Sequence, residues 1–369
     1  MKKNNIENGW IQITDRCNLK CQYCYMDANK DNRDISLDQF KEIVKKFKVL
    51  GIRNVMLSGG EPCLHAELTK MIDYLHANQL GCGLVTNGTE LSLQLVQCLE
   101  RNGVSVQVSV DSVDKENYIQ SRGIDRLDSV LHNIKQMLKY DIPISLSNTL
   151  NDFTVPRIRQ VVEFAMKNSI HTLHFCFLIP SERCKKNGVL FSSITDALNE
   201  LYHLQLENFM NIQIGVIESY VRYVGGDQGQ DYFCNSMAGK NIEVLPNGDI
   251  YQCGALESSM NHVNTPNIYK LSGDELKVML DSSMKRIGVD CLEGCISCDI
   301  KGICKGGCRA IPYQILGDIM EVQPLCAELH KFINGIIEDY KRGVLDNYLN
   351  YLKFVDNCQG KSRHCLRYF

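Results

Sequence analysis

Residues 10–24 read Trp-Ile-Gln-Ile-Thr-Asp-Arg-Cys-Asn-Leu-Lys-Cys-Gln-Tyr-Cys, a short apolar run that leads directly into three cysteines. The apolar alternation over residues 10–14 predicts a β-strand. Five further strand patterns follow, each succeeded by helical periodicity such as that of residues 37–50 and 127–140; they cover residues 54–58, 83–86, 104–111, 144–149 and 172–178. Strands separated by single helices predict parallel pairing with right-handed crossovers, in an open doubly wound sheet or a barrel. Six βα units are two short of a closed eightfold barrel.

Polar and glycine residues gather directly after these strands, at residues 14–15, 58–60, 86–88 and 109–112. Parallel α/β folds place their chemistry at this C-terminal edge of the sheet. We therefore expect the functional site at this edge.

The pattern changes after residue 225. Residues 225–229 (Gly-Gly-Asp-Gln-Gly) indicate a linker, residues 246–249 (Pro-Asn-Gly-Asp) indicate a hairpin, and helical periodicity returns over residues 328–356. We expect an α/β chain with three parts: a partial (βα)6 TIM-like barrel at 8–225, a small metal-organised domain at 226–330, and a C-terminal helical extension with a polar tail at 331–369.

Composition narrows the function classes. The 369 residues include 40 basic and 43 acidic residues, a net charge of −3, so no basic excess indicates nucleic acid or an anionic membrane as a partner. No signal peptide and no apolar run long enough to span a bilayer is present, which predicts a cytoplasmic protein. In a reducing compartment, the 18 cysteines are expected to be metal ligands or catalytic thiols rather than disulfides.

Cys17, Cys21 and Cys24 have C-x3-C-x2-C spacing on one short loop. Three thiolates can hold three irons of a [4Fe-4S] cluster and leave the fourth iron open for chemistry. The alternative is a zinc site completed by a remote His or Cys, although zinc sites more often use C-x2-C pairs.

With Tyr25 and the later Gly59-Gly60-Glu61-Pro62, this loop resembles that of the radical S-adenosylmethionine (SAM) enzymes, over residues 8–225. The resemblance implies that SAM chelates the open iron. One electron then cleaves SAM to methionine and a 5'-deoxyadenosyl radical, which abstracts a hydrogen atom from the substrate.

The resemblance also implies SAM contacts. Gly59, Gly60, Glu61 and Pro62 match the stretch that accepts the SAM amino group, and Tyr23 matches an aromatic residue near the adenine. Ser109, Asp111 and Arg122 match elements suited to the ribose and the SAM carboxylate. Asn87 and Asn148 are further candidates; alternatively, each caps its neighbouring turn.

The C-terminal cysteines resemble the SPASM domain, an extension of some radical SAM enzymes that carries two auxiliary [4Fe-4S] clusters. The analogy assigns Cys295, Cys298, Cys304 and Cys326 to one cluster, and Cys234, Cys253 and Cys308 to the other. The missing eighth ligand is either Cys291 or absent, which would leave an iron open. The alternative for this region is one or two structural zinc sites.

The remaining cysteines have simpler interpretations. Cys98 shares a predicted helical face with Leu91 and Leu95 and is expected in the core. Cys63 and Cys184 could face the edge of the sheet and donate a hydrogen atom to a substrate radical. Cys358 and Cys365 lie on the polar tail, as exposed thiols or a further ligand pair.

The resemblance implies oxidative modification of a ribosomally made peptide, such as a thioether or carbon-carbon cross-link, with the auxiliary clusters as an electron relay. Flavodoxin or ferredoxin would supply electrons. Because the barrel begins near residue 10, any leader peptide is expected to be held elsewhere or by a separate protein. Formylglycine formation in sulfatases ranks lower, because Gly254 follows Cys253 where those relatives have Asp. Three competing functions are a radical SAM enzyme acting on a small molecule or cofactor precursor, an iron-sulfur electron carrier and a zinc-stabilised binding protein.

Overall fold

The computed structural model describes residues 6–227, 231–259, 265–284 and 286–359. One nine-stranded sheet lies at its centre, in the order β7-β6-β5-β4-β3-β2-β1-β8-β9. Every neighbouring pair is parallel except β8 and β9. The outermost strands, β7 and β9, do not pair with each other in the described part of the chain, so the sheet stays open. The strands are β1 (Asn8–Thr14), β2 (Asn54–Gly59), β3 (Gly81–Thr86), β4 (Ser105–Ser109), β5 (Ile144–Leu150), β6 (Thr172–Phe177), β7 (Gln213–Ile214), β8 (Asn241–Val244) and β9 (Ile250–Tyr251).

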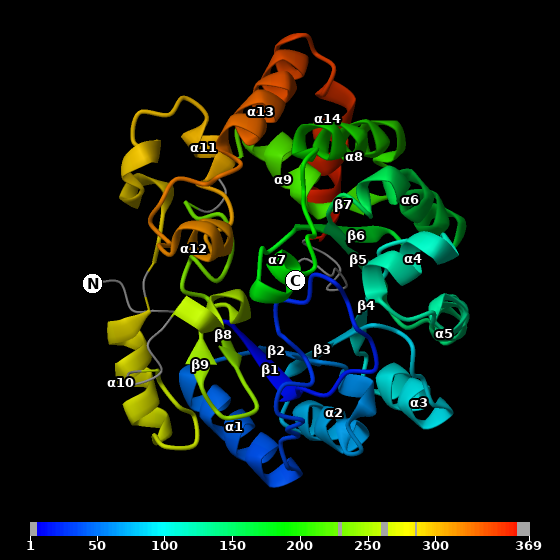
Figure 1. The fold of residues 1–369 in the computed structure, drawn as a ribbon, viewed down its shortest axis with the longest axis vertical. Helices are drawn as coiled ribbons and strands as arrows, with labels where there is room; N and C mark the ends of the chain where they lie inside the picture. The colour runs from blue at the N-terminus through cyan, green and yellow to red at the C-terminus, as the bar shows by residue number, and fades with distance from the viewer. Residues whose placement is uncertain (1–5, 228–230, 260–264, 285, 360–369) are drawn as a thin grey trace.

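Helices α1 to α6 and α8 form an arc around the outer side of this sheet, α7 lies near the middle of the view, α10 lies beside α1, and α11 and α12 lie at the upper left (Figure 1). The predicted α/β class with a parallel sheet is confirmed, and the six predicted strands correspond to β1 to β6. The helices are α1 (Leu37–Leu50), α2 (Leu68–Ala77), α3 (Leu93–Arg101), α4 (Lys115–Arg122), α5 (Leu127–Lys139), α6 (Ile158–Lys167), α7 (Glu182–Lys186), α8 (Ile194–Asn208), α9 (Gly215–Val224), α10 (Gly273–Ser283), α11 (Lys301–Cys304), α12 (Ala310–Leu316), α13 (Cys326–Lys341) and α14 (Asp346–Gln359).

Helix α1 shows how local sequence sets these elements. Ser36 and Gln39 form a capping box at its N-terminus, and Gly51 ends it in the left-handed conformation at φ 83°. Phe40 and Phe47 lie fully buried on the face that covers the sheet. Burial of such aromatic side chains stabilises the layer by about 1.5–3 kcal/mol each. Cys98 of α3 is likewise buried, as predicted.

The region after α9 continues the same sheet. Strand β8 pairs with β1, and the predicted hairpin is confirmed by the antiparallel pairing of β8 with β9 around Gly248, which has φ 89°. The sheet therefore crosses the predicted boundary at residue 225, and the three-part division remains a prediction. Residues 228–230 of the predicted linker lie outside the described residues.

The predicted C-terminal helical stretch is two helices, α13 and α14, separated at Gly343, which has φ 77°. Helix α13 packs Phe332 against Tyr202 of α8 and Tyr220 of α9, with ring centroids 6.2 Å and 6.0 Å apart. In the described residues, no helix combines the length and apolarity needed to cross a membrane.

Candidate active site

The cysteine loop, residues 15–29, leaves β1 and carries Cys17, Cys21 and Cys24. The side chain of Asn29 accepts a hydrogen bond from the backbone N–H of Cys17 at 2.8 Å and donates to the Cys17 carbonyl at 3.0 Å. Before Cys17, the guanidinium of Arg16 donates to Asp34 at 2.9 Å, and the Thr14 hydroxyl donates to the same carboxylate. Hydrogen bonds at Cys17 and at the residues before it therefore fix the backbone that carries the first thiol.

The C-terminus of α4 holds the middle of this loop. The N–H groups of Lys20 and Gln22 donate to the carbonyls of Arg122 and Ser121 at 3.1 Å and 3.0 Å. Gly123 ends α4 at φ 78°, and a Cβ at this position would lie 2.4 Å from the Lys20 carbonyl oxygen. Only glycine fits both the backbone angle and this close approach.

The carboxylate of Asp111 lies fully buried beside the loop and is occupied by protein donors. It accepts hydrogen bonds from the hydroxyls of Tyr23 and Ser121 and from Arg122 Nη2, the last at 2.9 Å. The N–H of Thr149 donates to it at 3.3 Å. Asp111 was expected to meet the ribose of SAM; the structure shows it holding Tyr23 and Arg122 in place.

Arg122 was expected to meet the SAM carboxylate. Its guanidinium lies 2.8 Å from Asp111 (Nε to Oδ2) and 3.7 Å from the sulfur of Cys21. Burial raises the pKa of Cys21 to about 12, and the Arg122 charge opposes that rise. Arg122 therefore compensates negative charge both at Asp111 and at the second thiol.

The Gly59-Gly60 turn brings the end of β2 against the end of β1. Gly60 N–H donates to the Thr14 carbonyl at 2.8 Å, and Glu61 N–H donates to the Arg16 carbonyl at 2.7 Å. A Cβ on Gly59 or Gly60 would lie 2.1 Å or 2.3 Å from those same oxygens. The two glycines are therefore needed for backbone contact.

The Glu61 side chain is fully buried, and its carboxylate turns back into the protein. It accepts from the Thr86 hydroxyl at 2.7 Å and from the N–H groups of Asn87 and Cys63 at 2.6 Å and 2.9 Å. Burial raises its pKa, and these three hydrogen bonds oppose the rise. The Glu61 carboxylate is therefore occupied by protein donors, and the carbonyls of Glu61 and Pro62 accept from the N–H groups of Leu64 and His65 at 3.1 Å and 2.9 Å.

Asn87 caps its own turn, as the simpler interpretation of this residue predicts. Its Oδ1 accepts from the Thr89 N–H at 2.9 Å. Its Nδ2 also donates to Asn18 at 2.9 Å and lies 3.9 Å from the sulfur of Cys17. Asn87 therefore links the end of β3 to the cysteine loop.

Asn148 and Ser109 lie at the same edge of the sheet, on β5 and β4. Asn148 Nδ2 donates to the Asp111 carbonyl at 2.7 Å, but its buried Oδ1 has no hydrogen-bond partner in the described residues. A buried acceptor without a partner costs about 1–3 kcal/mol. SAM has ammonium and hydroxyl groups that could donate to the Asn148 Oδ1. The residues at this edge therefore fit SAM.

The three thiols of the cysteine loop fit a metal cluster. The pKa of Cys17 and of Cys21 is raised first by burial, and the charge of ionised Cys24 raises both further. Thiols crowded enough to disfavour one another's ionisation are typical of a cation site, because a bound metal stabilises all the thiolates together.

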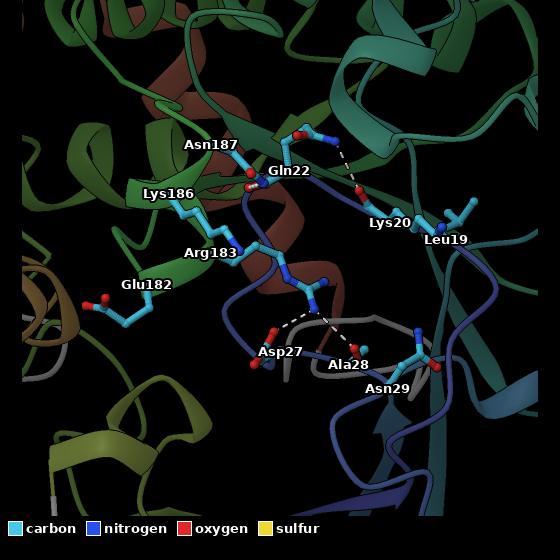
Figure 2. Close-up of a pocket in the computed structure, with 10 residues that line it drawn as sticks. All are labelled: Leu19, Lys20, Gln22, Asp27, Ala28, Asn29, Glu182, Arg183, Lys186 and Asn187. Atoms are coloured by element: carbon cyan, nitrogen blue, oxygen red, sulfur yellow. Dashed lines mark hydrogen bonds and ion pairs between the residues drawn. The ribbon is translucent and has the colours of Figure 1, made fainter.

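The outer side of the loop borders a polar pocket of about 680 Å³ against α7 (Figure 2). Figure 2 shows Arg183 reaching from α7 to Asp27, at 2.5 Å, and to the Ala28 carbonyl, at 3.1 Å. The Asn187 side chain donates to the Gln22 carbonyl at 3.0 Å. Helix α7 therefore braces the loop from outside.

The assignment of the C-terminal cysteines to two clusters stays a prediction, but charge interactions link cysteines within each of the two predicted groups. The pKa of Cys253 is raised by burial and by the charges of Glu243, Cys308 and Cys234. In the other group, burial raises the pKa of Cys304 to about 11, and the charges of Cys326, Cys295 and Cys298 add to the rise. Both groups therefore fit clusters held by thiolates, as the first loop does.

Cys291 ends a short 3-10 helix and is exposed. None of the strongest charge interactions of Cys253 or Cys308 involves it. Its role as an eighth ligand stays a prediction, as does the role of Cys358, which is exposed. Cys365 lies outside the described residues.

Cys298, one of the predicted ligands in the group with Cys304, also lies close to nitrogen and oxygen donors. One ligand atom from each of Cys298, Asp299 and His330 lies within 4.8 Å of the others, and His330 Nε2 is 2.9 Å from Asp299. Sulfur, nitrogen and oxygen donors of this kind also suit zinc, so metal analysis must distinguish zinc from iron.

A larger cavity of about 870 Å³ joins the two cysteine regions. Its lining includes Tyr25, which follows Cys24, together with Cys176 of β6 and the thiols of Cys253 and Cys308. Tyr25 is 43% exposed, although it lies between these groups, because it faces the cavity. The sequence could not place the side chains that line this cavity, because they come from segments far apart in the chain.

The two candidate hydrogen donors differ in their surroundings. The Cys63 sulfur is 3.4 Å from the Thr86 hydroxyl, within the Glu61 network at the edge of the sheet. Cys184 is only 1% exposed, and its thiol donates to the Val189 carbonyl at 3.3 Å. Cys184 lies in an apolar cluster with Tyr23 and Val189, and its role as a hydrogen donor stays a prediction.

Glu243 is a site residue that motif spacing missed. Its carboxylate accepts from Gln12 Nε2 at 2.7 Å and from the Gly254 N–H at 2.6 Å. A Cβ on Gly254 would lie 2.6 Å from that carboxylate. A carboxylate thus lies beside Cys253 in space although Gly254 follows it in sequence. A glutamate within the apolar strand β8 was the available signal.

The comparisons with known proteins agree with this geometry. Residues 11–165 match the Radical SAM superfamily. GTP 3',8-cyclase of Clostridium perfringens is 28% identical over 66% of this chain and 79% of its own. AdoMet-dependent heme synthase of Methanosarcina barkeri is 24% identical over 85% of this chain and 94% of its own.

The fold has a solved counterpart. The structure of anSMEcpe with bound AdoMet and Cp18Cys peptide superposes with a TM-score of 0.74, at 18% identity, over 93% of this chain and 99% of that chain. At this identity the likeness shows the fold. The family match and the cysteine loop together place a radical SAM domain at residues 11–165 of this chain, and the residues of its cysteine loop fit SAM and a [4Fe-4S] cluster.

Proposed function

We propose that this enzyme oxidatively modifies a ribosomally made peptide, by a thioether or carbon-carbon cross-link or a related change to a residue. The main support for the proposal is the cavity of about 870 Å³, which is lined by Tyr25 of the cysteine loop and by the C-terminal cysteines Cys234, Cys253 and Cys308. Ligand cavities hold about 300–1,000 Å³, so this one has room for a peptide segment. The structural counterpart with a bound peptide supports the same substrate class.

Tyr25 shows how closely the two cysteine regions approach. It directly follows Cys24 of the cysteine loop and lines the same cavity as Cys253. One side chain thus connects the cysteine loop with the C-terminal cysteines. A substrate against Tyr25 would lie between the first cluster and an auxiliary one.

When bound, SAM and the clusters supply the radical that takes a hydrogen atom from the substrate and the route by which an electron leaves it. The chain holds the loop that presents Cys17, Cys21 and Cys24, and Arg122 compensates charge at Cys21. Gln12 and Gly254 hold Glu243 beside Cys253. We assign two auxiliary [4Fe-4S] clusters to the two C-terminal cysteine groups.

The second candidate function is modification of a small molecule. It is favoured by the sequence relatives, whose names describe a GTP cyclase and a heme synthase. Formylglycine formation also stays open, because the Glu243 carboxylate lies beside Gly254. The position of this carboxylate weakens the sequence argument that ranked that activity lower.

A flavodoxin or ferredoxin is the proposed electron donor, and the pocket of Figure 2 is its proposed approach to the cysteine loop. Lys20 and Lys186 are exposed there, whereas Arg183 is paired with Asp27. Lys186→Glu should slow reduction by flavodoxin but not by dithionite, because only the protein donor must dock. Equal slowing by both reductants would contradict this docking site.

The substrate test is SAM cleavage that depends on the added substrate. The reconstituted enzyme receives SAM and dithionite with a library of ribosomally made peptides, with GTP, or with a porphyrin. The proposal predicts 5'-deoxyadenosine formation coupled to loss of hydrogen from a peptide, read by mass spectrometry. Coupled turnover of GTP or porphyrin alone would establish the second candidate.

A further inference from the structure

Lys305 is a buried cation in the wall of the larger cavity. It ends α11 in the left-handed conformation, at φ 54° and ψ 23°, and is 9% exposed. Its ammonium lies 5.0 Å from the centroid of the Tyr223 ring, and both residues line the cavity. Lysine is uncommon both at such a backbone angle and at such burial.

No carboxylate pairs with Lys305 among the described residues. The other long cation of the cavity wall, Arg222, is paired with Glu218 at 2.6 Å and with Asp356 at 2.7 Å. In the same wall, the buried hydroxyl of Tyr220 also has no hydrogen-bond partner in the described part of the chain. The Tyr223 ring offsets part of the cost of burying the ammonium, but an aromatic face supplies no counter-charge.

A carboxylate is the ligand that this arrangement lacks, because it would supply both the charge and the hydrogen-bond acceptor. The cavity lining includes the aromatic residues Tyr25, Phe177, Tyr223 and Phe233. We propose that Lys305 binds a carboxylate of the substrate whose adjoining group is apolar or aromatic. This inference rests on the proposed function only in taking the cavity as the substrate site.

The carboxylate has two possible sources in a peptide, an acidic side chain and the C-terminus. Four probes separate them: acetyl-Tyr-Asp-amide against acetyl-Tyr-Asn-amide, and acetyl-Tyr-Ala against its C-terminal amide. Binding is measured by ligand-observed NMR on the reconstituted full-length protein without SAM, so that no turnover is needed. The variants are Lys305→Met, Lys305→Arg and, as a matched control, Lys301→Met. Lys301 begins the same helix, is partly exposed and pairs with Asp290.

Wild type should bind at least one carboxylate probe about tenfold more tightly than its neutral partner, as expected for a charged hydrogen bond. Lys305→Met should abolish this preference, whereas Lys305→Arg and Lys301→Met should retain it. The pair that shows the preference identifies the source of the carboxylate. Equal binding of charged and neutral probes by wild type would overturn the proposal.

A second role for Lys305 would be to balance the charge of an auxiliary cluster, because it lies between Cys304 and Cys308 in sequence. Iron content and EPR spectra of each variant test this role. A changed auxiliary signal in Lys305→Met with an intact carboxylate preference would overturn the subsite. A carboxylate preference without peptide turnover would instead retain the subsite and reject the proposed peptide substrate.

Discussion

Arg122 Nε lies 2.8 Å from Asp111 Oδ2 in a buried ion pair, and the same guanidinium is 3.7 Å from the sulfur of Cys21. One cation thus serves a structural carboxylate and a cluster thiol. Because both members of the ion pair are buried, each depends on the other for its counter-charge. The pair therefore links the stability of the fold to the charge at the cysteine loop.

Asp111→Asn should lower the free energy of unfolding by about 3–5 kcal/mol, because Arg122 is left buried with an uncompensated charge. Denaturant unfolding of the protein without clusters measures this loss. The matched control is Asp73→Asn, which breaks an exposed pair with Arg101 at 2.8 Å and should cost about 1 kcal/mol or less. Equal losses in the two variants would contradict the role assigned to Asp111.

Gly123→Ala should destabilise the protein and reduce the iron held by the cysteine loop. Its Cβ would meet the Lys20 carbonyl at 2.4 Å, so the loop must shift. Gly51→Ala is the control, because Gly51 also ends a helix with positive φ but has no atom within 4 Å of an added Cβ. The control should cost about 1–2 kcal/mol and leave iron content unchanged. Unchanged iron in both variants would argue against the docking role of α4.

Asn148→Ala should weaken SAM binding by about tenfold, because the buried Oδ1 has no partner in the described protein and is free to accept from SAM. Equilibrium dialysis with labelled SAM on the reconstituted enzyme gives the dissociation constant. Asn148→Asp keeps an acceptor at this position and should bind SAM more tightly than the alanine variant. Identical affinity in wild type and Asn148→Ala would remove Asn148 from the SAM site.

His174 should make the protein less stable as the pH falls from about 7 to 5. Burial lowers its pKa from 6.5, so the unfolded chain binds this proton at a higher pH than the folded chain does. Stability therefore rises with pH between the folded and unfolded pKa values. His174→Gln should reduce the difference in unfolding free energy between pH 5.5 and 7.5. An unchanged difference would show that His174 titrates normally.

Local signals made most of the fold predictable. Ser36, Gln39 and Gly51 fix both ends of α1, and the apolar runs of β1 to β6 were readable as strands buried by helices. The break between α13 and α14 was missed, although Gly343 marks it. Glycine inside a helical pattern is tolerated often enough that it does not by itself predict a break.

The thiols of the site were predictable, and their surroundings were not. Ligand spacing is a local property of the chain, so Cys17, Cys21 and Cys24 could be grouped from sequence. The hydrogen bonds that Tyr23 and Arg122 donate to the Asp111 carboxylate depend on contacts between separate elements of the fold. The approach of Glu243 to Gly254 likewise depends on the β8–β9 hairpin register, and the lack of a partner for Lys305 depends on the whole cavity wall.

The most direct test of the account is metal and sulfide analysis with EPR on anaerobically reconstituted protein. Wild type is compared with the Cys17/Cys21/Cys24→Ala triple variant, each with and without SAM. The account predicts about twelve irons in wild type, about four fewer in the variant, and an EPR signal that SAM perturbs only in wild type. Stoichiometric zinc with little iron, or a SAM-perturbed signal that survives in the triple variant, would contradict it.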